Sequence, residues 1–432
     1  MTTHYLKIIL PLITLTGCNS DSKTSAEINP QATTEYTLLS SYSYNMSVLN
    51  STNIHSKWSS LRIIKENPNE ALYYPDVATD GKGVLISVWQ SEYNPLYGGE
   101  YDVVFSASYD NGMTWSDTEL VNPTDTTDSE SDEDPQISTD GYGNWVIIWS
   151  SSEDINGSGN DSDIVFSHSE DNGKTWTTPK LINNYADDDS SRDWSPQISL
   201  KENRWVAVWS SSRSLDPIDN TDDMDILTSY SLDNGVTWST PIYVNQTTIS
   251  DDKTDYFNQF DMNDSGYGVV SWAGEHDSSD LDIYAAITHD FGESWSQPTL
   301  INNYALSETC MSNCNDYPTS VAVNNTGDTV IAWEGINPVT GSDNEAYISY
   351  SKNLGASWSN ETYLNTNALT DGTRDNDDAL KIHPISNTKW VAYWVATNGD
   401  NVIFRTSNDL IQWSDETIIT TGVDEVVALA IH

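Results

Sequence analysis

Short apolar runs recur along the chain, and each is bounded by glycine and polar residues. A representative run is Trp145-Val146-Ile147-Ile148-Trp149, which is apolar at every position. A run this short without alternation predicts a strand packed between two neighbouring sheets rather than a helix. The predicted strands of this kind are 84–89, 145–149, 205–209, 269–272, 330–333 and 390–394.

A second segment, of the form Ser-x-Asp-x-Gly-x-x-Trp, follows each apolar run. Close copies begin at Ser108, Ser169 and Ser231, looser copies begin at Thr288 and Ser351, and a sixth, 407–413, lacks the glycine and one residue. Successive copies start 61, 62, 57, 63 and 56 residues apart. This period is too long for one turn of a solenoid and suits a four-stranded propeller blade.

Each repeat reads as four strands. In the second repeat, a first strand at 135–138 and a turn at 139–141 lead to the apolar strand, a third strand at 164–166 enters the box, and 179–182 follows its tryptophan. The sequence therefore predicts an all-β, six-bladed β-propeller of four-stranded antiparallel sheets spanning residues 58–432. We expect Trp58–Ile64 and Val426–Ile431 to help close the ring.

The repeated box resembles the Asp-box, or BNR repeat, of the sialidase superfamily over roughly residues 70–420. In such a hairpin the aspartate accepts N–H groups of its own turn, the glycine takes a positive φ, and the tryptophan packs beneath. The resemblance implies a sialidase-like propeller whose boxes lie on the face away from the active site. It therefore indicates the fold and leaves the activity open.

The N-terminus carries an export pattern. An apolar stretch at 8–13 precedes Leu15-Thr16-Gly17-Cys18, which resembles a bacterial lipobox and predicts cleavage of the first 17 residues and lipidation of Cys18. Asn19 resembles the sorting position of outer-membrane lipoproteins. Residues 18–57, rich in Ser, Thr and Asn, are expected to form a flexible tether. We expect an outer-membrane lipoprotein facing the periplasm or cell surface; a lone cysteine near an ordinary signal peptide is the alternative.

Two further cysteines, Cys310 and Cys314, form an even pair in a chain expected to be exported. A disulfide is favoured over a zinc site, because zinc would require two more ligands that are not evident nearby.

The charge is strongly acidic, with 65 Asp+Glu against 18 Lys+Arg and a net charge of −47. Such a chain repels phosphate, which excludes a nucleic-acid binder, and it lacks the apolar runs of a polytopic membrane protein. We call the end of the propeller that carries the boxes the box face. The opposite end, the loop face, carries the long acidic loops after the second and fourth strands: 125–134, 153–163, 187–193, 216–225, 251–255 and 371–378.

Two acidic positions recur on the loop face. One set precedes the first strand of a blade: Asp132, Asp193, Asp255, Asp316, and Asp375 or Asp377. The other precedes the box: Asp102, Asp163, Asp225, Asp282 and Glu345. Their repetition favours a structural role in capping the backbone at strand ends. The alternative is calcium, with Asp132, Asp134, Asp193, Asp255 and Asp316 as ligands.

A sialidase grips the carboxylate of its substrate with three converging arginines and attacks with a tyrosine activated by a glutamate. Of the six arginines here, Arg192, Arg213 and Arg374 fall on the loop face, and two of these belong to one blade. That departs from the family pattern, so no catalytic residue follows from the resemblance.

Residues that differ between blades are better site candidates than repeated ones. The candidates for acid/base work are Glu275, His276, Glu334 and Asp193, and those for substrate binding are Arg192, Trp194, Arg213, Arg374, Tyr256 and Tyr317. Solvated carboxylates and packed aromatic rings are the plainer interpretations.

Two functions remain open. The first is an exported, lipid-anchored propeller that binds glycans or protein partners on its acidic loop face without turnover. The second is a sialidase-like exo-glycosidase, or another carbohydrate-active enzyme, acting on extracellular glycans. Neither requires a cofactor other than the possible calcium, and contact with the membrane is expected through the N-terminal lipid only.

Overall fold

The computed structural model describes most of the chain downstream of residue 35. The described residues are 36–42, 45–51, 62–66, 72–91, 101–122, 130–183, 191–201, 203–213, 215, 223–245, 253–275, 281–302, 315–336, 344–366, 377–396, 401–420 and 428–431. Every regular element assigned in these ranges is a strand, and none of the ranges contains a helix able to cross a membrane. Cys18, Cys310, Cys314, His276 and Arg374 lie outside the described residues.

Each of the six repeats folds into one four-stranded antiparallel sheet. From the axis outward, the first three sheets are β4 (Leu72–Thr79), β5 (Leu85–Ser91), β6 (Asp102–Ser108) and β7 (Glu119–Leu120); β8 (Asp132–Thr139), β9 (Trp145–Ser151), β10 (Asp163–Ser169) and β11 (Lys180–Leu181); and β12 (Asp193–Lys201), β13 (Arg204–Ser211), β14 (Asp225–Ser231) and β15 (Ile242–Tyr243).

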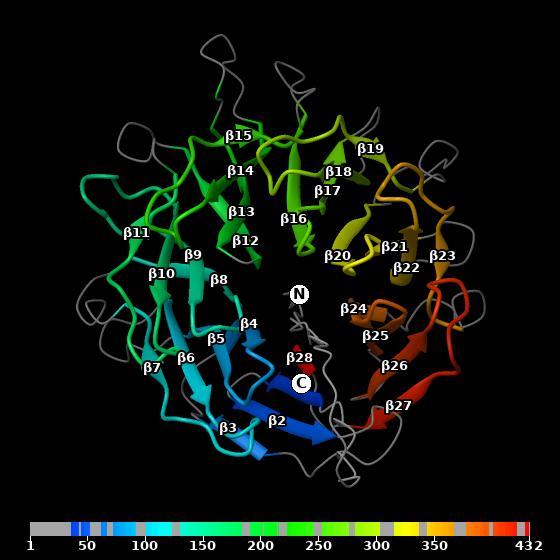
Figure 1. Cartoon of the computed structure of the whole chain (residues 1–432), viewed down its shortest axis with the longest axis horizontal. Coiled ribbons are helices and arrows are strands. Elements are labelled where there is room, and N and C mark those ends of the chain that lie inside the picture. The colour runs from blue at the N-terminus through cyan, green and yellow to red at the C-terminus, as the bar shows by residue number, and fades with distance from the viewer. Residues whose placement is uncertain are drawn as a thin grey trace, which may run out of the picture.

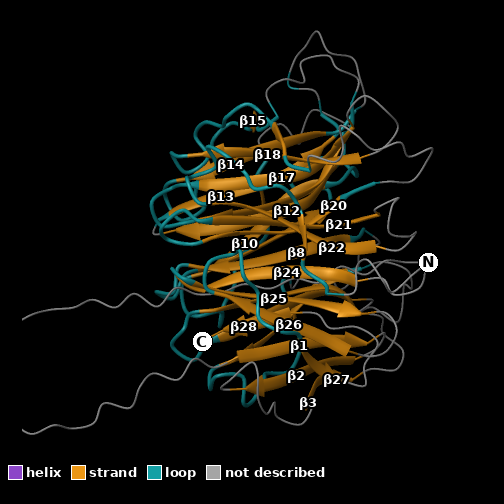
Figure 2. Ribbon diagram, turned by 90° about the vertical axis from the view of Figure 1, so that its right-hand side faces the viewer, coloured by secondary structure: helices purple, strands orange, loops and turns teal. Residues whose placement is uncertain are grey.

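The other three follow the same order. They are β16 (Asp255–Met262), β17 (Gly268–Glu275), β18 (Leu281–Thr288) and β19 (Thr299–Leu300); β20 (Tyr317–Val323), β21 (Thr329–Ile336), β22 (Asn344–Ser351) and β23 (Thr362–Tyr363); and β24 (Asp377–Ser386), β25 (Lys389–Ala396), β26 (Asn401–Ser407) and β27 (Thr417–Thr420). The sheets stand around a common axis (Figure 1), and their strands run between the two faces (Figure 2). All six predicted blades are therefore confirmed.

A further four-stranded sheet joins the two ends of the described chain. Its order is β28 (Ala428–Ile431), β1 (Tyr36–Tyr42), β2 (Asn45–Ser51) and β3 (Arg62–Glu66), and it stands in the ring between the first and sixth box blades (Figure 1). β1 pairs with β28 from Tyr36↔Ile431 to Leu39↔Ala428. The two segments expected to close the ring thus each contribute a strand to this closing sheet.

The closing sheet corrects the predicted domain boundary. Residues 36–42 and 45–51, expected within a flexible tether, form β1 and β2, so the propeller includes strands upstream of residue 58. Local periodicity did not reveal these strands because β1 pairs with a segment at the far end of the chain. A sequence signal existed: Ser51, Asn53 and Trp58 occupy box positions, 57 residues before the box that begins at Ser108.

The boxes form the hairpins that the resemblance implied. In the second repeat, Ser169 Oγ donates to Asp171 Oδ1 at 2.8 Å, and the N–H of Gly173 donates to Ser169 Oγ at 2.9 Å. The N–H and hydroxyl of Thr175 donate to the Asp171 carboxylate at 2.9 and 2.8 Å. These hydrogen bonds lower the pKa of Asp171 to about 2, so the carboxylate stays ionised and keeps the turn closed.

The tryptophans at the ends of the second strands fill the space between blades. Trp89, Trp149, Trp209, Trp272, Trp333 and Trp394 are all fully buried. Each apolar cluster joins two blades; for example, Val146 and Ile148 of one sheet pack with Ala207 and Trp209 of the next. Burial on both faces explains why the second strands are apolar at every position.

Two glycines with positive φ allow the cost of backbone strain to be distinguished from the cost of a steric clash. A Cβ on Gly235 (φ +75°) would lie 2.2 Å from the Trp205 ring, whereas a Cβ on Gly157 (φ +95°) would meet nothing within 4 Å. We expect Gly235→Ala to destabilise the fold by about 3 kcal/mol or more, because the buried indole must move. The matched control, Gly157→Ala, should cost about 1 kcal/mol. Denaturant unfolding measures both, and equal losses would contradict the packing shown.

Candidate functional site

The innermost strands are interrupted at their loop-face ends. In four successive blades the register shifts between the residue pairs Tyr73/Asp76, Glu133/Gln136, Trp194/Gln197 and Tyr256/Gln259. Each bulge contains a non-glycine residue with positive φ: Tyr74 (46°), Asp134 (55°), Ser195 (52°) and Phe257 (57°). Such a conformation costs about 1–3 kcal/mol and is typical of functional sites.

Proline accounts for part of this geometry. Tyr74, Asp134 and Ser195 are each followed by proline, which has no N–H to donate and therefore suits a position where strand pairing is interrupted. The backbone of the bulge is similar in the four blades, whereas the side chain at the positive-φ position differs from blade to blade.

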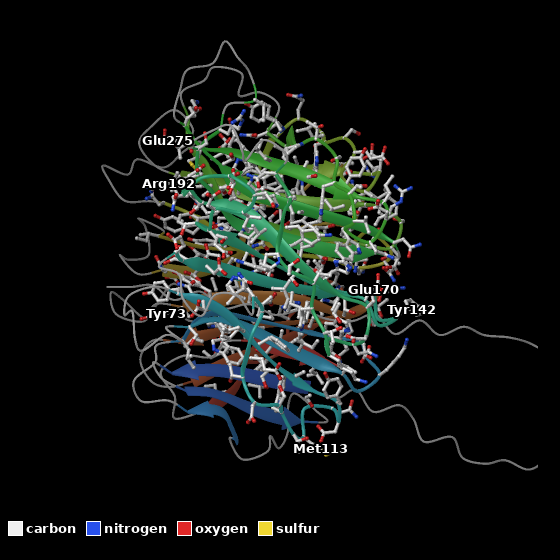
Figure 3. The ribbon with its side chains drawn as sticks, turned by 90° about the vertical axis from the view of Figure 1, so that its left-hand side faces the viewer. Tyr73, Met113, Tyr142, Glu170, Arg192 and Glu275 are labelled. Carbon is white, nitrogen blue, oxygen red and sulfur yellow. The ribbon has the colours of Figure 1, made fainter. Side chains whose placement is uncertain are left out.

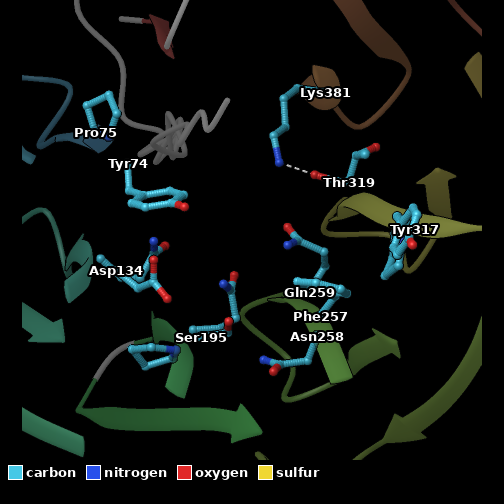
Figure 4. A pocket seen from close by; sticks show the side chains of 14 residues that line it. Tyr74, Pro75, Asp134, Ser195, Phe257, Asn258, Gln259, Tyr317, Thr319 and Lys381 are labelled. Atoms are coloured by element: carbon cyan, nitrogen blue, oxygen red, sulfur yellow. Dashed lines mark hydrogen bonds between the residues drawn. The ribbon is translucent and has the colours of Figure 1, made fainter. Parts of the chain in front are cut away.

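These bulges surround a pocket on the propeller axis (Figure 4). The pocket encloses about 800 Å³, open solvent included, and takes residues from the innermost strand of all six box blades. Its lining residues are Tyr74, Pro75, Asp134, Gln136, Ser195, Pro196, Gln197, Phe257, Asn258, Gln259, Tyr317, Pro318, Thr319 and Lys381. Because these residues begin the innermost strands, the pocket lies at the loop face.

The pocket wall combines amides, aromatic rings and two charges. Three glutamines, Gln136, Gln197 and Gln259, occupy the same position in successive blades, two residues after the residue with positive φ. Lys381 reaches in from β24 and donates a hydrogen bond to the carbonyl oxygen of Thr319 (Figure 4). Asp134 is the only carboxylate among the described lining residues.

Tyr74 remains a hydrogen-bond donor at neutral pH. Burial, reinforced by the nearby charges of Asp134 and Glu133, raises the pKa of its phenol to about 12. Burial also raises the pKa of Tyr256, with Tyr317 and Glu275 contributing. In the same strand as Lys381, burial and the nearby Lys381 charge lower the pKa of His383 to about 3, so its imidazole is neutral.

The two recurrent acidic positions meet between blades. Asn183 donates from Nδ2 to Asp163 Oδ1 and to Asp193 Oδ2, both at 2.7 Å, so one amide joins two carboxyl groups. The same bridge recurs as Asp225–Asn245–Asp255 and Asp282–Asn302–Asp316, and Asn365 binds Glu345 in the next blade. The bridges accord with the structural interpretation of these carboxylates.

The calcium candidates are dispersed. Asp132, Asp193, Asp255 and Asp316 each begin or precede a different innermost strand and are buried, while Asp134 lines the axial pocket. Among the described residues, no group of three or more acidic, histidine or cysteine side chains is arranged to hold a metal ion.

The arginines whose side chains are described do not line the pocket. Arg204 pairs with Glu293 at 3.2 Å and lies 4.5 Å from the Phe291 ring centroid, on the box face. Arg405 donates to the carbonyls of Leu364, Trp413 and Ser414. Arg192 and Arg213 belong to one blade, where the N–H of Ser212 donates to the carbonyl of Arg192 at 3.0 Å.

The remaining candidates divide between the pocket and the blades. Tyr317 lines the pocket, and Tyr256 contacts Phe257, which also lines it. Glu334 is buried in β21 opposite Tyr317, and Glu275 ends β17, half-buried, opposite Leu281. The half-buried Trp194 pairs with Ser210.

Figure 3 shows Tyr73, Arg192 and Glu275 at the loop face, with Met113, Tyr142 and Glu170 at the box face.

Asp193 is bound on several sides. Its Oδ1 accepts from Trp209 Nε1 at 3.2 Å, its Oδ2 accepts from Asn183, and its N–H donates to the carbonyl of Ser162 at 2.7 Å. Asp193, a predicted candidate for acid/base work, therefore connects two neighbouring blades through its hydrogen bonds.

The glutamines, Ser195, Phe257 and Lys381 are not among the site residues predicted from the sequence. A signal for most of them was present, because Asp134-Pro135-Gln136, Ser195-Pro196-Gln197 and Phe257-Asn258-Gln259 occupy equivalent places in three repeats. Its meaning depends on the bulge that turns these residues toward the axis, and the bulge is visible only in the structure.

The chain matches no protein-family model and no curated protein. Among solved structures it is similar to an ulvan lyase of a polysaccharide lyase family, with a TM-score of 0.56 and 10% identity over 91% of each chain. A protein of unknown function from Dyadobacter fermentans has a TM-score of 0.50 and 13% identity over 77% of this chain and 93% of its own.

A Hadza microbial sialidase has a TM-score of 0.47 and 14% identity over 89% of this chain and 73% of its own. At such identities the likeness concerns the fold alone. The predicted propeller fold is confirmed by its six four-stranded box blades and by the likeness to the ulvan lyase structure.

The asparagine bridge can be tested by one isosteric change. Asn183→Asp places a third carboxyl group between Asp163 and Asp193, and we expect a loss of about 3 kcal/mol at pH 8. The loss should shrink toward pH 5, because protonation of one carboxyl group relieves the repulsion. Asn160→Asp, at an exposed site in the same blade, is the control and should change stability by less than about 0.5 kcal/mol. Equal thermal shifts in the two variants would contradict the bridge.

Proposed function

We propose that this chain is an exported carbohydrate-binding propeller that holds a saccharide in the axial pocket of its loop face. The observation that carries the proposal is the lining of the pocket, where glutamines from three successive blades lie between aromatic rings of the first blade and of the fourth and fifth blades. Glutamine amides both donate and accept hydrogen bonds, as sugar hydroxyls do, and an aromatic ring suits the apolar face of a pyranose.

The same lining favours binding over hydrolysis. Glycosidases generally use two carboxyl groups flanking the scissile bond, and Asp134 is the only carboxylate among the described lining residues. In the part of the chain that the structure describes, no arginine lines the pocket, whereas the sialidase pattern requires three that converge. The second candidate, a carbohydrate-active enzyme, is supported by the strained Asp134 backbone and by the protonated Tyr74 nearby.

Export and anchoring remain part of this proposal. The support for them is the lipobox-like Leu15-Thr16-Gly17-Cys18 after a short apolar stretch. A lipid at Cys18 would hold the propeller at a membrane surface outside the cytoplasm, where glycans are available as ligands.

Binding is tested with a polysaccharide and oligosaccharide array, followed by calorimetry on each saccharide that binds. Gln197→Ala should weaken binding about tenfold, because it removes hydrogen bonds to the sugar. Gln412→Ala, at an exposed position on the box face, is the matched control and should leave affinity unchanged. Saccharide binding that Gln197→Ala and Gln259→Ala leave intact would contradict the axial site.

Turnover is tested separately with fluorogenic glycosides, sialosides included. The pocket lining predicts no release of the fluorophore above the uncatalysed rate. Release that disappears in Arg192→Ala, Arg213→Ala or Arg374→Ala would instead favour a sialidase-like enzyme with its site outside the axial pocket.

A further inference from the structure

Two groups of aromatic rings flank the axial pocket. The first, which we call the Tyr74 platform, consists of Tyr73, Tyr74 and Tyr101. The Tyr73 ring meets that of Tyr101 edge-on with centroids 5.6 Å apart, and the centroids of Tyr73 and Tyr74 are 6.5 Å apart. Of these three rings, Tyr74 alone lines the pocket, so the aromatic surface continues outward beyond the pocket wall.

The second group, the Phe257 platform, consists of Tyr256, Phe257 and Tyr317. The rings of Tyr256 and Phe257 are 4.5 Å apart, and Phe257 meets Tyr317 edge-on at 5.5 Å. Phe257 and Tyr317 line the pocket, and Tyr256 extends the platform past it. All three side chains are half-buried.

The two platforms stand across the axis from each other. Tyr74 belongs to the first box blade, whereas Phe257 and Tyr317 belong to the fourth and fifth. Figure 4 shows Tyr74 and Tyr317 on opposite sides of the pocket. Rings on both sides provide stacking positions for sugar units beyond the one held at the axis.

From this arrangement we infer that the site takes an internal stretch of an extended, neutral polysaccharide chain, running from one aromatic platform across the pocket to the other. The inference rests on the proposed function and specifies its ligand. A site for a single terminal sugar would gain nothing from Tyr101 and Tyr256, which lie outside the pocket lining.

The charges favour a neutral chain. The protein carries a net charge of −47, and acidic residues are concentrated in the loop-face segments. A polyanionic saccharide would be repelled by this field along its whole length. Inside the pocket, the ammonium of Lys381 and the carboxylate of Asp134 offset each other formally and offer a donor and an acceptor to hydroxyl groups.

The test uses the full chain and calorimetry with neutral oligosaccharides of one to eight units: β-1,4-gluco, β-1,3-gluco, β-1,4-xylo and β-1,4-manno series. Galacturonate oligomers of matched length provide the anionic comparison. For the series that binds, affinity should rise at least about tenfold between two and six units and exceed that of the galacturonate hexamer.

Variants of Tyr101 and Tyr256, the two rings outside the pocket lining that are tested, show whether these rings cause the gain in affinity with chain length. Tyr256→Ala and Tyr101→Ala should each weaken hexamer binding about fivefold and dimer binding much less, while Tyr256→Phe should retain hexamer affinity because the ring remains. Tyr109→Ala, an exposed tyrosine on the box face, is the control.

A dimer that binds as tightly as a hexamer, or galacturonate that binds more tightly than the neutral chains, would overturn this inference and leave the proposed function standing. If no saccharide of any series or of the array binds, both are wrong.

Discussion

The hydrogen-bonded bridge between blades is the interaction on which the pocket depends. One asparagine amide binds the carboxyl group that begins the third strand of its own blade and the carboxyl group that begins the next blade. Removing two carboxyl groups from water is costly, and the cost is offset only where their oxygens are hydrogen-bonded. The bridges therefore fix the loop-face ends of successive innermost strands relative to each other.

The residues that follow the bridges along the innermost strands contribute to the wall of the axial pocket. In β12, Asp193 is bound between blades, Trp194 comes next, and Ser195 takes a positive φ that starts the bulge. The repeated backbone brings side chains from each box blade to the axis, and the sequence of each repeat decides which side chains these are. A nearly symmetric scaffold thus produces an asymmetric pocket, with Tyr74 and Phe257 across the axis from each other and Lys381 beside Thr319.

The repeats made the blades predictable because their signals are local. The box from Ser108 to Trp115 and an apolar second strand such as Trp145 to Trp149 depend on residues close in sequence. The closing sheet was harder to predict from the sequence, because β1 pairs with β28 nearly 400 residues away. Glu275 and Arg192 were selected because they lie on the loop face and differ between blades, and neither lines the axial pocket. The glutamines of the pocket were missed because only the bulge gives their position a meaning.

A crystal structure of the protein with a saccharide that it binds would test the proposed axial site. We expect the sugar in the axial pocket, within hydrogen-bonding distance of Gln197 and Gln259 and stacked on Tyr74 or Phe257. A saccharide bound at the outer part of a blade, beside Arg192 and Arg213, with the axial pocket holding only water, would contradict it.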